Sequence, residues 1–391
     1  MDLPDLAARL RNLPFYLYPT IDRATEKARK NGQDIIDLST GEPEFGTPTH
    51  VIETLQRACA NPATHRYGNM KGYRPFREAI AGWYKRRFNV NLDPAREIIT
   101  FVGSKEGIAF LPLAFIDPGD VVIIPDPGYP TYRYAAAFAG ARLESLPLRP
   151  QNLYVPDFSD LPAPIAEKAK MIFLNYPNNP TGATVERDFF NDAVLFAKRF
   201  NVIICHDAAY SEIVFDGYRA PSLLEIPDAK EVGVEFHTLS KTYCMTGWRL
   251  GFAVGNERVI DALLAVKRVS ASGHFSALEM AGATALEAES TELNLNNERF
   301  RERRNFVIDR LRKFGIEVRP PRGSFYIWFP IRNCDDSLSF CVNLILNTGV
   351  VTFPGIGYGK NGEGHLRIAV VQDLPRIQEA FGRIEPYLKE G

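Results

Sequence analysis

From about residue 95 to residue 255 the chain repeats one pattern: a short apolar run, a turn rich in Pro, Gly, Asp and Asn, and an amphipathic stretch long enough for a helix. The apolar runs lie at 97–102, 120–124, 171–174, 202–205, 236–239 and 250–254. Several are apolar at nearly every position, which is typical of strands covered on both faces. Their alternation with helices predicts an α/β domain on a mainly parallel sheet.

The pattern changes after residue 276. Helices are predicted over 276–289, over 296–314 and from Leu374, and strands over 323–329 and 365–371. This order indicates a second, smaller α+β domain, which we expect residues 13–37 to join as a helix and a short strand. We therefore predict a large domain over 47–280 and a small domain that combines 1–46 with 281–391.

The charge balance excludes several classes of protein. The 391 residues include 46 Lys and Arg against 47 Asp and Glu, which gives a net charge of −1. A chain with this balance has no overall positive electrostatic potential that would attract nucleic acid. No uncharged stretch approaches the roughly 20 apolar residues that cross a bilayer. The acidic N-terminus lacks the regions of a secretory signal, and the five cysteines form no C-x-x-C pair. We expect a cytoplasmic protein with reduced thiols and small-molecule substrates, without nucleic-acid or membrane partners.

Common nucleotide and metal motifs are missing from the sequence. Neither G-x-G-x-x-G nor G-x-x-x-x-G-K-[ST] occurs, so a dinucleotide dehydrogenase or a P-loop enzyme is disfavoured. The six histidines show no ligand spacing such as H-x-x-x-H, so no metal site is predicted.

A lysine follows the apolar run at 236–239. Thr238, Ser240, Lys241 and Arg249 lie in the turn region at the end of that predicted strand. A lysine there can form an imine with a carbonyl, and hydroxyls and an arginine are donors that suit an anionic phosphate. Taken alone, the segment fits equally well a solvated loop lysine.

Three other strand ends carry polar residues. Ser104 and Lys105 open a helix after the first run, Asn178-Asn179-Pro180 follows the third, and Asp207 and Tyr210 follow the fourth. Helix capping and turn chemistry account for each one separately. Ligands of parallel sheets bind beyond the carboxyl ends of the strands, where these residues meet. Together they supply a phosphate cup, a lysine, an acid and an amide, which is the set that pyridoxal 5'-phosphate (PLP) requires.

The chemistry of PLP assigns a role to each residue type. Lys241 would hold PLP as an imine and then move the substrate proton, and Asp207 would pair with the pyridinium nitrogen. Asn179 and Tyr210 would donate to the phenolate oxygen, and Tyr129 would stack on the ring. The phosphate would be held by Ser104, Lys105, Thr238, Ser240 and Arg249. Arg367 would pair bidentately with a substrate α-carboxylate.

These residues form part of a series of motifs over nearly the whole chain. The series comprises Asp37-Leu-Ser-Thr-Gly41-Glu-Pro43, Tyr67, Gly72-Tyr-Arg74-Pro-Phe-Arg77, Pro177-Asn-Asn179-Pro-Thr-Gly182, Ser240-Lys241 and Arg367. The chain resembles the class I/II aminotransferases, whose fold is that of the fold type I PLP-dependent transferases. The resemblance implies a mainly parallel mixed sheet sandwiched by helices, a smaller α+β domain and a homodimer with shared active sites. It further implies that Tyr67 reaches the neighbouring subunit's phosphate and that Gly41 and Tyr16 line the substrate pocket.

Within the class, the chain is most similar to the LL-diaminopimelate aminotransferases. Matching stretches include Leu13-Pro-Phe-Tyr16, His206-Asp-Ala-Ala-Tyr210 and Met245-Thr-Gly-Trp-Arg249, although alanine–glutamate aminotransferases share many of them. Cys244 and Ala271 depart from the pattern near the expected pocket. The resemblance implies ping-pong transfer of an amino group from an amino acid, LL-2,6-diaminopimelate, to a 2-oxo acid, 2-oxoglutarate. An alanine–glutamate or broad-specificity aminotransferase and a PLP-dependent C–S β-lyase remain the alternatives.

Overall fold

The computed structural model describes residues 4–11, 13, 17–288 and 291–390. Its largest sheet has the strand order β2-β8-β7-β6-β5-β3-β4, and every strand except β8 runs parallel to the others. The strands are β2 (Ile98–Val102), β3 (Val121–Asp126), β4 (Arg142–Pro147), β5 (Ala169–Asn175), β6 (Ile203–Asp207), β7 (Gly233–Thr238) and β8 (Leu250–Gly255). The predicted α/β class with a mainly parallel mixed sheet is confirmed.

One strand, β4 at one edge of the sheet, is not predicted by the sequence pattern. Its residues Arg-Leu-Glu-Ser-Leu-Pro contain no apolar run, because only one neighbour, β3, pairs with it and most of its side chains are at least partly exposed. The other six strands coincide with the predicted apolar runs, with ends that differ by a few residues. Continuous apolar runs therefore mark the strands whose side chains are mostly buried, which include the edge strand β2 but not β4.

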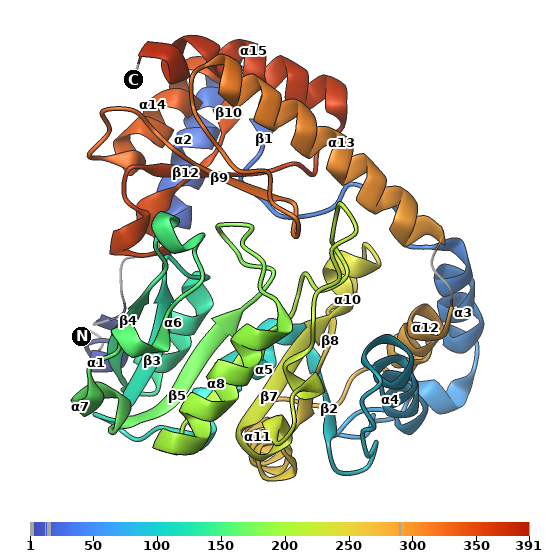
Figure 1. Cartoon of the computed structure of the whole chain (residues 1–391). Coiled ribbons are helices and arrows are strands. Elements are labelled where there is room, and N and C mark those ends of the chain that lie inside the picture. Colours follow the sequence, from blue (N-terminus) through green and yellow to red (C-terminus); the bar gives the residue numbers. More distant parts are fainter. Residues whose placement is uncertain (1–3, 12, 14–16, 289–290, 391) are drawn as a thin grey trace.

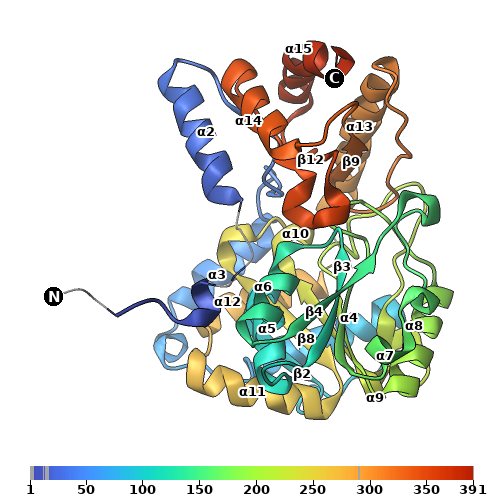
Figure 2. The same cartoon turned by 90° about the vertical axis from the view of Figure 1, so that its left-hand side faces the viewer.

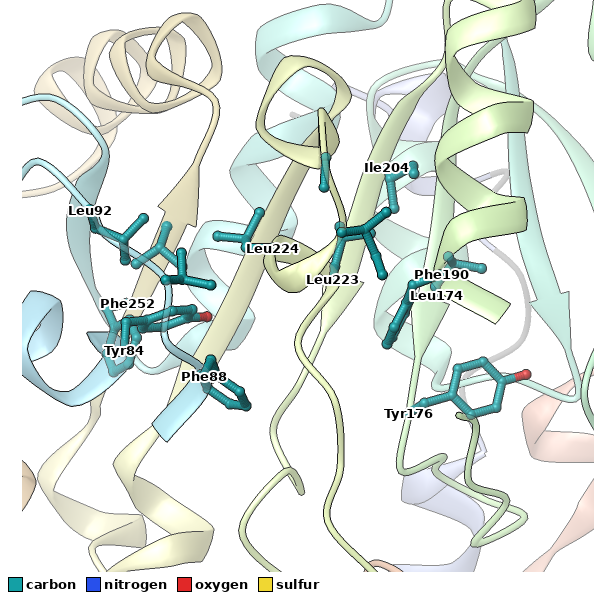
Figure 3. Close-up of a cluster of buried hydrophobic side chains, with 14 of the residues drawn as sticks. Tyr84, Phe88, Leu92, Leu174, Tyr176, Phe190, Ile204, Leu223, Leu224 and Phe252 are labelled. Atoms are coloured by element: carbon teal, nitrogen blue, oxygen red, sulfur yellow. The ribbon is translucent and has the colours of Figure 1, made fainter. Parts of the chain in front are cut away.

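Helices cover both faces of this sheet (Figure 1). One face packs against α3 (Thr49–Cys59), α4 (Arg74–Phe88), α8 (Arg187–Phe200) and α12 (Ser276–Glu287). The other packs against α5 (Ser104–Phe115), α6 (Pro130–Phe138) and α11 (Glu257–Ser270). Figure 3 shows part of the first core, where Leu174 and Ile204 from the strands meet Phe190 of α8. Neighbouring strand residues divide between the two cores, as the pleat requires.

A second group of elements lies above the carboxyl ends of the large sheet in Figure 1. Its strands are β9 (Tyr326–Pro330), β12 (His365–Ala369) and β11 (Phe353–Pro354), which form an antiparallel sheet, and β1 (Ile36–Asp37), which pairs with β10 (Val350–Val351). Its helices are α2 (Tyr18–Lys30), α13 (Thr291–Lys313), α14 (Ser337–Thr348) and α15 (Leu374–Glu390). Residues from both ends of the chain thus share one core.

Helix α13 joins these two groups. Helix α13 begins five residues before the predicted start at 296 and runs from beside α3 and α12 up to α15 (Figures 1 and 2). The remaining short helices are α1 (Ala8–Arg11), which contacts α6, and α7 (Ala163–Ala166), α9 (Ala229–Val232) and α10 (Leu239–Thr242). Within the described residues, no helix has the length and apolar character needed to span a membrane.

Candidate active site

The polar strand ends converge on one cavity. Strands β2, β5, β6 and β7 are parallel and β8 is antiparallel, so the ends of the first four and the start of β8 lie at the same edge. The cavity there is lined by Ser104, Lys105, Tyr129, Tyr132, Asn175, Asn179, Asp207, Ala209, Tyr210, Thr238, Ser240, Lys241 and Arg249. A second cavity shares Tyr129, Asn179, Tyr210 and Lys241 with it and adds Gly41, Glu42, Tyr326 and Arg367.

Lys241 lies between the two cavities, on the short helix α10 that follows β7. Its ammonium group donates to the Gly41 carbonyl, which belongs to the segment after β1. Burial lowers the pKa of Lys241 to about 8, and the positive charges of Arg249 and Arg367 act in the same direction, while Glu42 opposes them. A buried amine with a lowered pKa is a nucleophile near neutral pH.

Asp207 is buried at the end of β6. Its carboxylate accepts a hydrogen bond from the Tyr132 hydroxyl at 2.7 Å, and its carbonyl accepts one from Asn175 Nδ2 at 2.7 Å. Burial raises the pKa of the Asp207 carboxyl, and the bond from Tyr132 opposes this rise. The carboxylate thus lies at a fixed, buried place in the cavity, where a cationic partner would favour its charged form.

Hydroxyl, guanidinium and backbone donors gather at the β2 side of the cavity. Gly103 precedes α5 with φ of +73°, and a Cβ at this position would lie 2.4 Å from Arg249 Nη2, so the guanidinium can approach the backbone closely only because the residue is glycine. Arg249 Nη1 donates to Ser240 Oγ at 3.4 Å. Thr238 lines the cavity as well, but its hydroxyl donates to the Leu250 carbonyl and caps α10.

Arg367 forms the opposite wall, on β12. Its guanidinium donates to Asn179 Oδ1 at 3.0 Å and to the Ser39 carbonyl, and it lies 4.1 Å from the centre of the Tyr326 ring. The Tyr210 and Tyr326 hydroxyls are 3.2 Å apart beside it. Arg367 Nε is buried and has no hydrogen-bond partner among the described residues. Arg367 also lines the second cavity, where a guanidinium fits a carboxylate.

The donor set fits PLP. The groups that line one cavity include a lysine, a buried carboxylate, and Ser and Arg donors with the start of helix α5, and these are the groups that an aldehyde, a ring nitrogen and a phosphate need. Metal chemistry has no comparable basis, since the described part of the chain contains no group of three or more His, Cys, Asp and Glu side chains placed to hold an ion.

One predicted residue, Tyr67, is not brought into these cavities, and several unpredicted residues are, among them Tyr132, Asn175 and Tyr326. Tyr67 is 99 % exposed in the single chain and lines neither cavity, and Tyr16 lies outside the described residues. Tyr132 and Asn175, which hold Asp207, were missed. Tyr132 lies one helical turn after Tyr129, and Asn175 directly precedes the predicted turn. This spacing could have indicated both residues, although each position is equally typical of the hydrophobic core.

Comparisons with known proteins agree with this geometry. The family model described as "Aminotransferase class I and II" matches residues 33–384. The chain is 47% identical over 378 residues, 97% of each chain, to a protein of Syntrophobacter fumaroxidans named LL-diaminopimelate aminotransferase. Among solved structures it is similar to substrate-bound BacF of Bacillus subtilis, with 36% identity, a TM-score of 0.94 and 98% of each chain covered.

Another solved structure of this group is a probable N-succinyldiaminopimelate aminotransferase of Thermus thermophilus. It is 36% identical to this chain, with a TM-score of 0.90, and the match covers 95% of this chain and 100% of that one. The chain therefore belongs to the class I and II aminotransferases and is a PLP-dependent transaminase.

Proposed function

We propose that the protein transfers the amino group of LL-2,6-diaminopimelate to 2-oxoglutarate by a ping-pong mechanism, with Lys241 as the point of covalent attachment of PLP. The observation that carries amino-group transfer is the Lys241 amine, whose pKa is about 8, between a cavity that contains Asp207 and a cavity that contains Arg367. The choice of donor is supported by relatives of 47% and 45% identity, which are named LL-diaminopimelate aminotransferases.

PLP, when bound, supplies an electron sink for negative charge at the substrate Cα. The chain's own residues prepare the reaction. Lys241, once its amine is free, is the base that takes a proton from the substrate and returns it, because its lowered pKa leaves part of it uncharged near neutral pH. Asp207, held by Tyr132, provides the negative charge that keeps a ring nitrogen protonated.

Arg367, in the second cavity, favours substrates that carry a carboxylate. Arg367 is anchored by Asn179 and Ser39 and lines the second cavity, where its guanidinium suits a substrate α-carboxylate. Amino acids and 2-oxo acids both carry this carboxylate, so the same arginine serves both halves of a ping-pong reaction.

We also propose a homodimer in which Tyr67 completes the partner's phosphate site. The 99 % exposure of Tyr67, between the segments at 62–65 and 74–88, supports this, because it leaves the side chain available to a partner subunit. Mixing inactive Lys241→Ala and Tyr67→Ala proteins should restore activity, because a hybrid dimer contains one site with both residues. Mixtures that stay inactive after subunit exchange would refute the shared site.

We also propose a division into two domains: a large domain over 47–280 and a small domain that combines 1–46 with 281–391. The separate core beneath β9 and β12 supports this division.

A cytoplasmic location is supported by the five cysteines, which are all free thiols.

A donor screen tests the proposed reaction. Purified protein with PLP and 2-oxoglutarate should form glutamate from LL-diaminopimelate faster than from alanine, aspartate or aromatic amino acids, and Lys241→Ala should abolish this. Glutamate from alanine alone would refute the donor and leave the transaminase class intact. Release of pyruvate and ammonia from cystathionine without glutamate formation would favour the β-lyase alternative.

A further inference from the structure

A buried polar cluster lies behind the proposed phosphate site and has no part in the chemistry described above. The cluster, called the Thr100 cluster here, consists of Thr100 on β2, Lys267 on α11, Glu279 on α12 and His274 between these helices. Thr100, Lys267 and Glu279 are fully buried, and His274 is nearly so. Buried lysine and glutamate side chains are costly unless they are paired, so their presence here needs a reason.

Thr100 joins the two charges. Lys267 Nζ donates to the Thr100 carbonyl at 2.6 Å, and the Thr100 hydroxyl donates to Glu279 Oε1 at 2.7 Å. Burial raises the pKa of the Glu279 carboxyl and lowers that of the Lys267 ammonium, and each charge opposes the shift of the other. The two charges thus hold one residue of β2 through its backbone and its side chain at once.

On one side the cluster reaches the phosphate-binding turn. The Arg249 carbonyl accepts a hydrogen bond from Gly103 N at 3.0 Å and another from His274 Nε2 at 3.3 Å. Burial lowers the pKa of His274 to about 4, so the ring is neutral at pH 7. His274 therefore supports the peptide group that fixes Gly103 next to the Arg249 guanidinium.

On the other side the cluster holds the segment that carries Tyr67. Glu279 Oε2 accepts a hydrogen bond from Tyr73 N at 2.8 Å, and Thr100 N donates to the Lys71 carbonyl at 3.1 Å. Gly72 has φ of +112°, and a Cβ there would lie 2.5 Å from the Thr100 side chain, so the segment lies directly on Thr100. Both segments that we assign to phosphate binding, one for each subunit, are thus tied to the same buried residue.

We propose that the Thr100 cluster is a positioning device for the cofactor phosphate, which sets the geometry of the β2–α5 turn and of the Tyr67 segment together. This inference rests on the proposed roles of Ser104, Arg249 and Tyr67. The members of the cluster are positioning residues, since none of them lines the cavity. A substitution that disrupts the cluster therefore reduces the binding free energy contributed by the cofactor phosphate and leaves the binding free energy contributed by the ring unchanged.

The test compares two probes of the full-length apo-protein: PLP, and pyridoxal, which lacks the phosphate. The measured quantity is the ratio of the pyridoxal Kd to the PLP Kd, obtained by absorption titration. Thr100→Val removes the hydroxyl that Glu279 accepts from but keeps the shape, and should lower the ratio about 5- to 10-fold, the effect of one typical hydrogen bond. Thr100→Ser keeps the hydroxyl and is the matched control, with a ratio like that of the wild type.

Glu279→Gln gives an independent perturbation, because it removes the negative charge and leaves Lys267 uncompensated; we expect a fall of at least about 10-fold. A ratio that stays unchanged while both Kd values rise equally would overturn the positioning role and leave only a structural one. Should the wild-type apo-protein bind PLP no better than pyridoxal, the proposed phosphate site itself would be wrong. Glu279→Gln is the variant more at risk of misfolding. If it does not fold, the comparison of Thr100→Val with Thr100→Ser still decides the test, because both substitutions nearly keep the size of the side chain.

Discussion

The charge of Glu42 should control the reactivity of the Lys241 amine. Burial and the positive charges of Arg249 and Arg367 lower the pKa of Lys241 to about 8, and Glu42 is the negative group that opposes them. Glu42→Gln removes this charge and keeps an acceptor for the hydrogen bond from Thr246. The pKa of Lys241 should therefore fall further, and the amine should become uncharged at a lower pH than in the wild type.

The size of the wild-type effect follows from the pKa. At pH 7 an amine with a pKa of about 8 is uncharged in roughly one molecule in ten, against about one in 3000 for an ordinary lysine of 10.5. Only the uncharged amine attacks an aldehyde, so Lys241 should capture PLP roughly 300-fold faster at pH 7 than an exposed lysine of equal nucleophilicity.

The assay is the initial rate at which apo-protein captures PLP, trapped by borohydride and measured from pH 6 to pH 11. The wild-type rate should rise with a midpoint near pH 8, and the midpoint of Glu42→Gln should lie lower. Glu44→Gln is the matched control, since the Glu44 carboxylate pairs with Arg303 and does not line the cavity. A wild-type midpoint at pH 10 or above, or a Glu42→Gln midpoint above that of the wild type, would refute the reasoning.

Three further predictions concern single residues. Arg367→Lys should raise KM for the amino acid about 10- to 100-fold with a smaller change in kcat, because lysine cannot form the bidentate pair; steady-state kinetics with equal losses in kcat would contradict this. Tyr132→Phe should weaken PLP affinity about 5- to 10-fold by removing the hydrogen bond to Asp207, and an unchanged Kd in apo-protein titration would show that this bond is not needed. Cys244→Asn should raise the free energy of unfolding by about 0.5 kcal/mol, because residue 244 has φ of +55°, a region that asparagine tolerates. Denaturant unfolding checks the last prediction, with Cys59→Asn in α3 as a control that should not stabilise.

Much of the site could be predicted because it is local in sequence. Asp207, Asn179 and Lys241 each follow directly after an apolar strand, and parallel strands end at the same edge, so their convergence follows from the strand pattern. The edge strand β4 could not be found in this way, because most of its side chains are at least partly exposed and its sequence shows no apolar run.

Contacts between distant segments lay beyond the reach of the pattern. Tyr132 reads as one more aromatic residue of a helix until α6 is packed on the sheet and its hydroxyl meets Asp207. His206 and Asp207 are adjacent, yet His206 bonds to Glu235 at 2.8 Å away from the cavity while Asp207 faces into it, because successive strand residues point to opposite faces. The sequence pattern predicts that successive strand residues point to opposite faces of the sheet, but it does not predict which face holds the cavity.

By itself the sequence determined the α/β class, the polar strand ends and the residues that suit PLP, because each depends on a few neighbouring positions. Only the tertiary structure decided that Lys241 is buried enough for its pKa to fall to about 8, that Arg367 keeps one spare donor, and that Lys267 and Glu279 meet at Thr100. The physical reason is that desolvation and charge pairing depend on which distant segments pack together, and no local pattern records that.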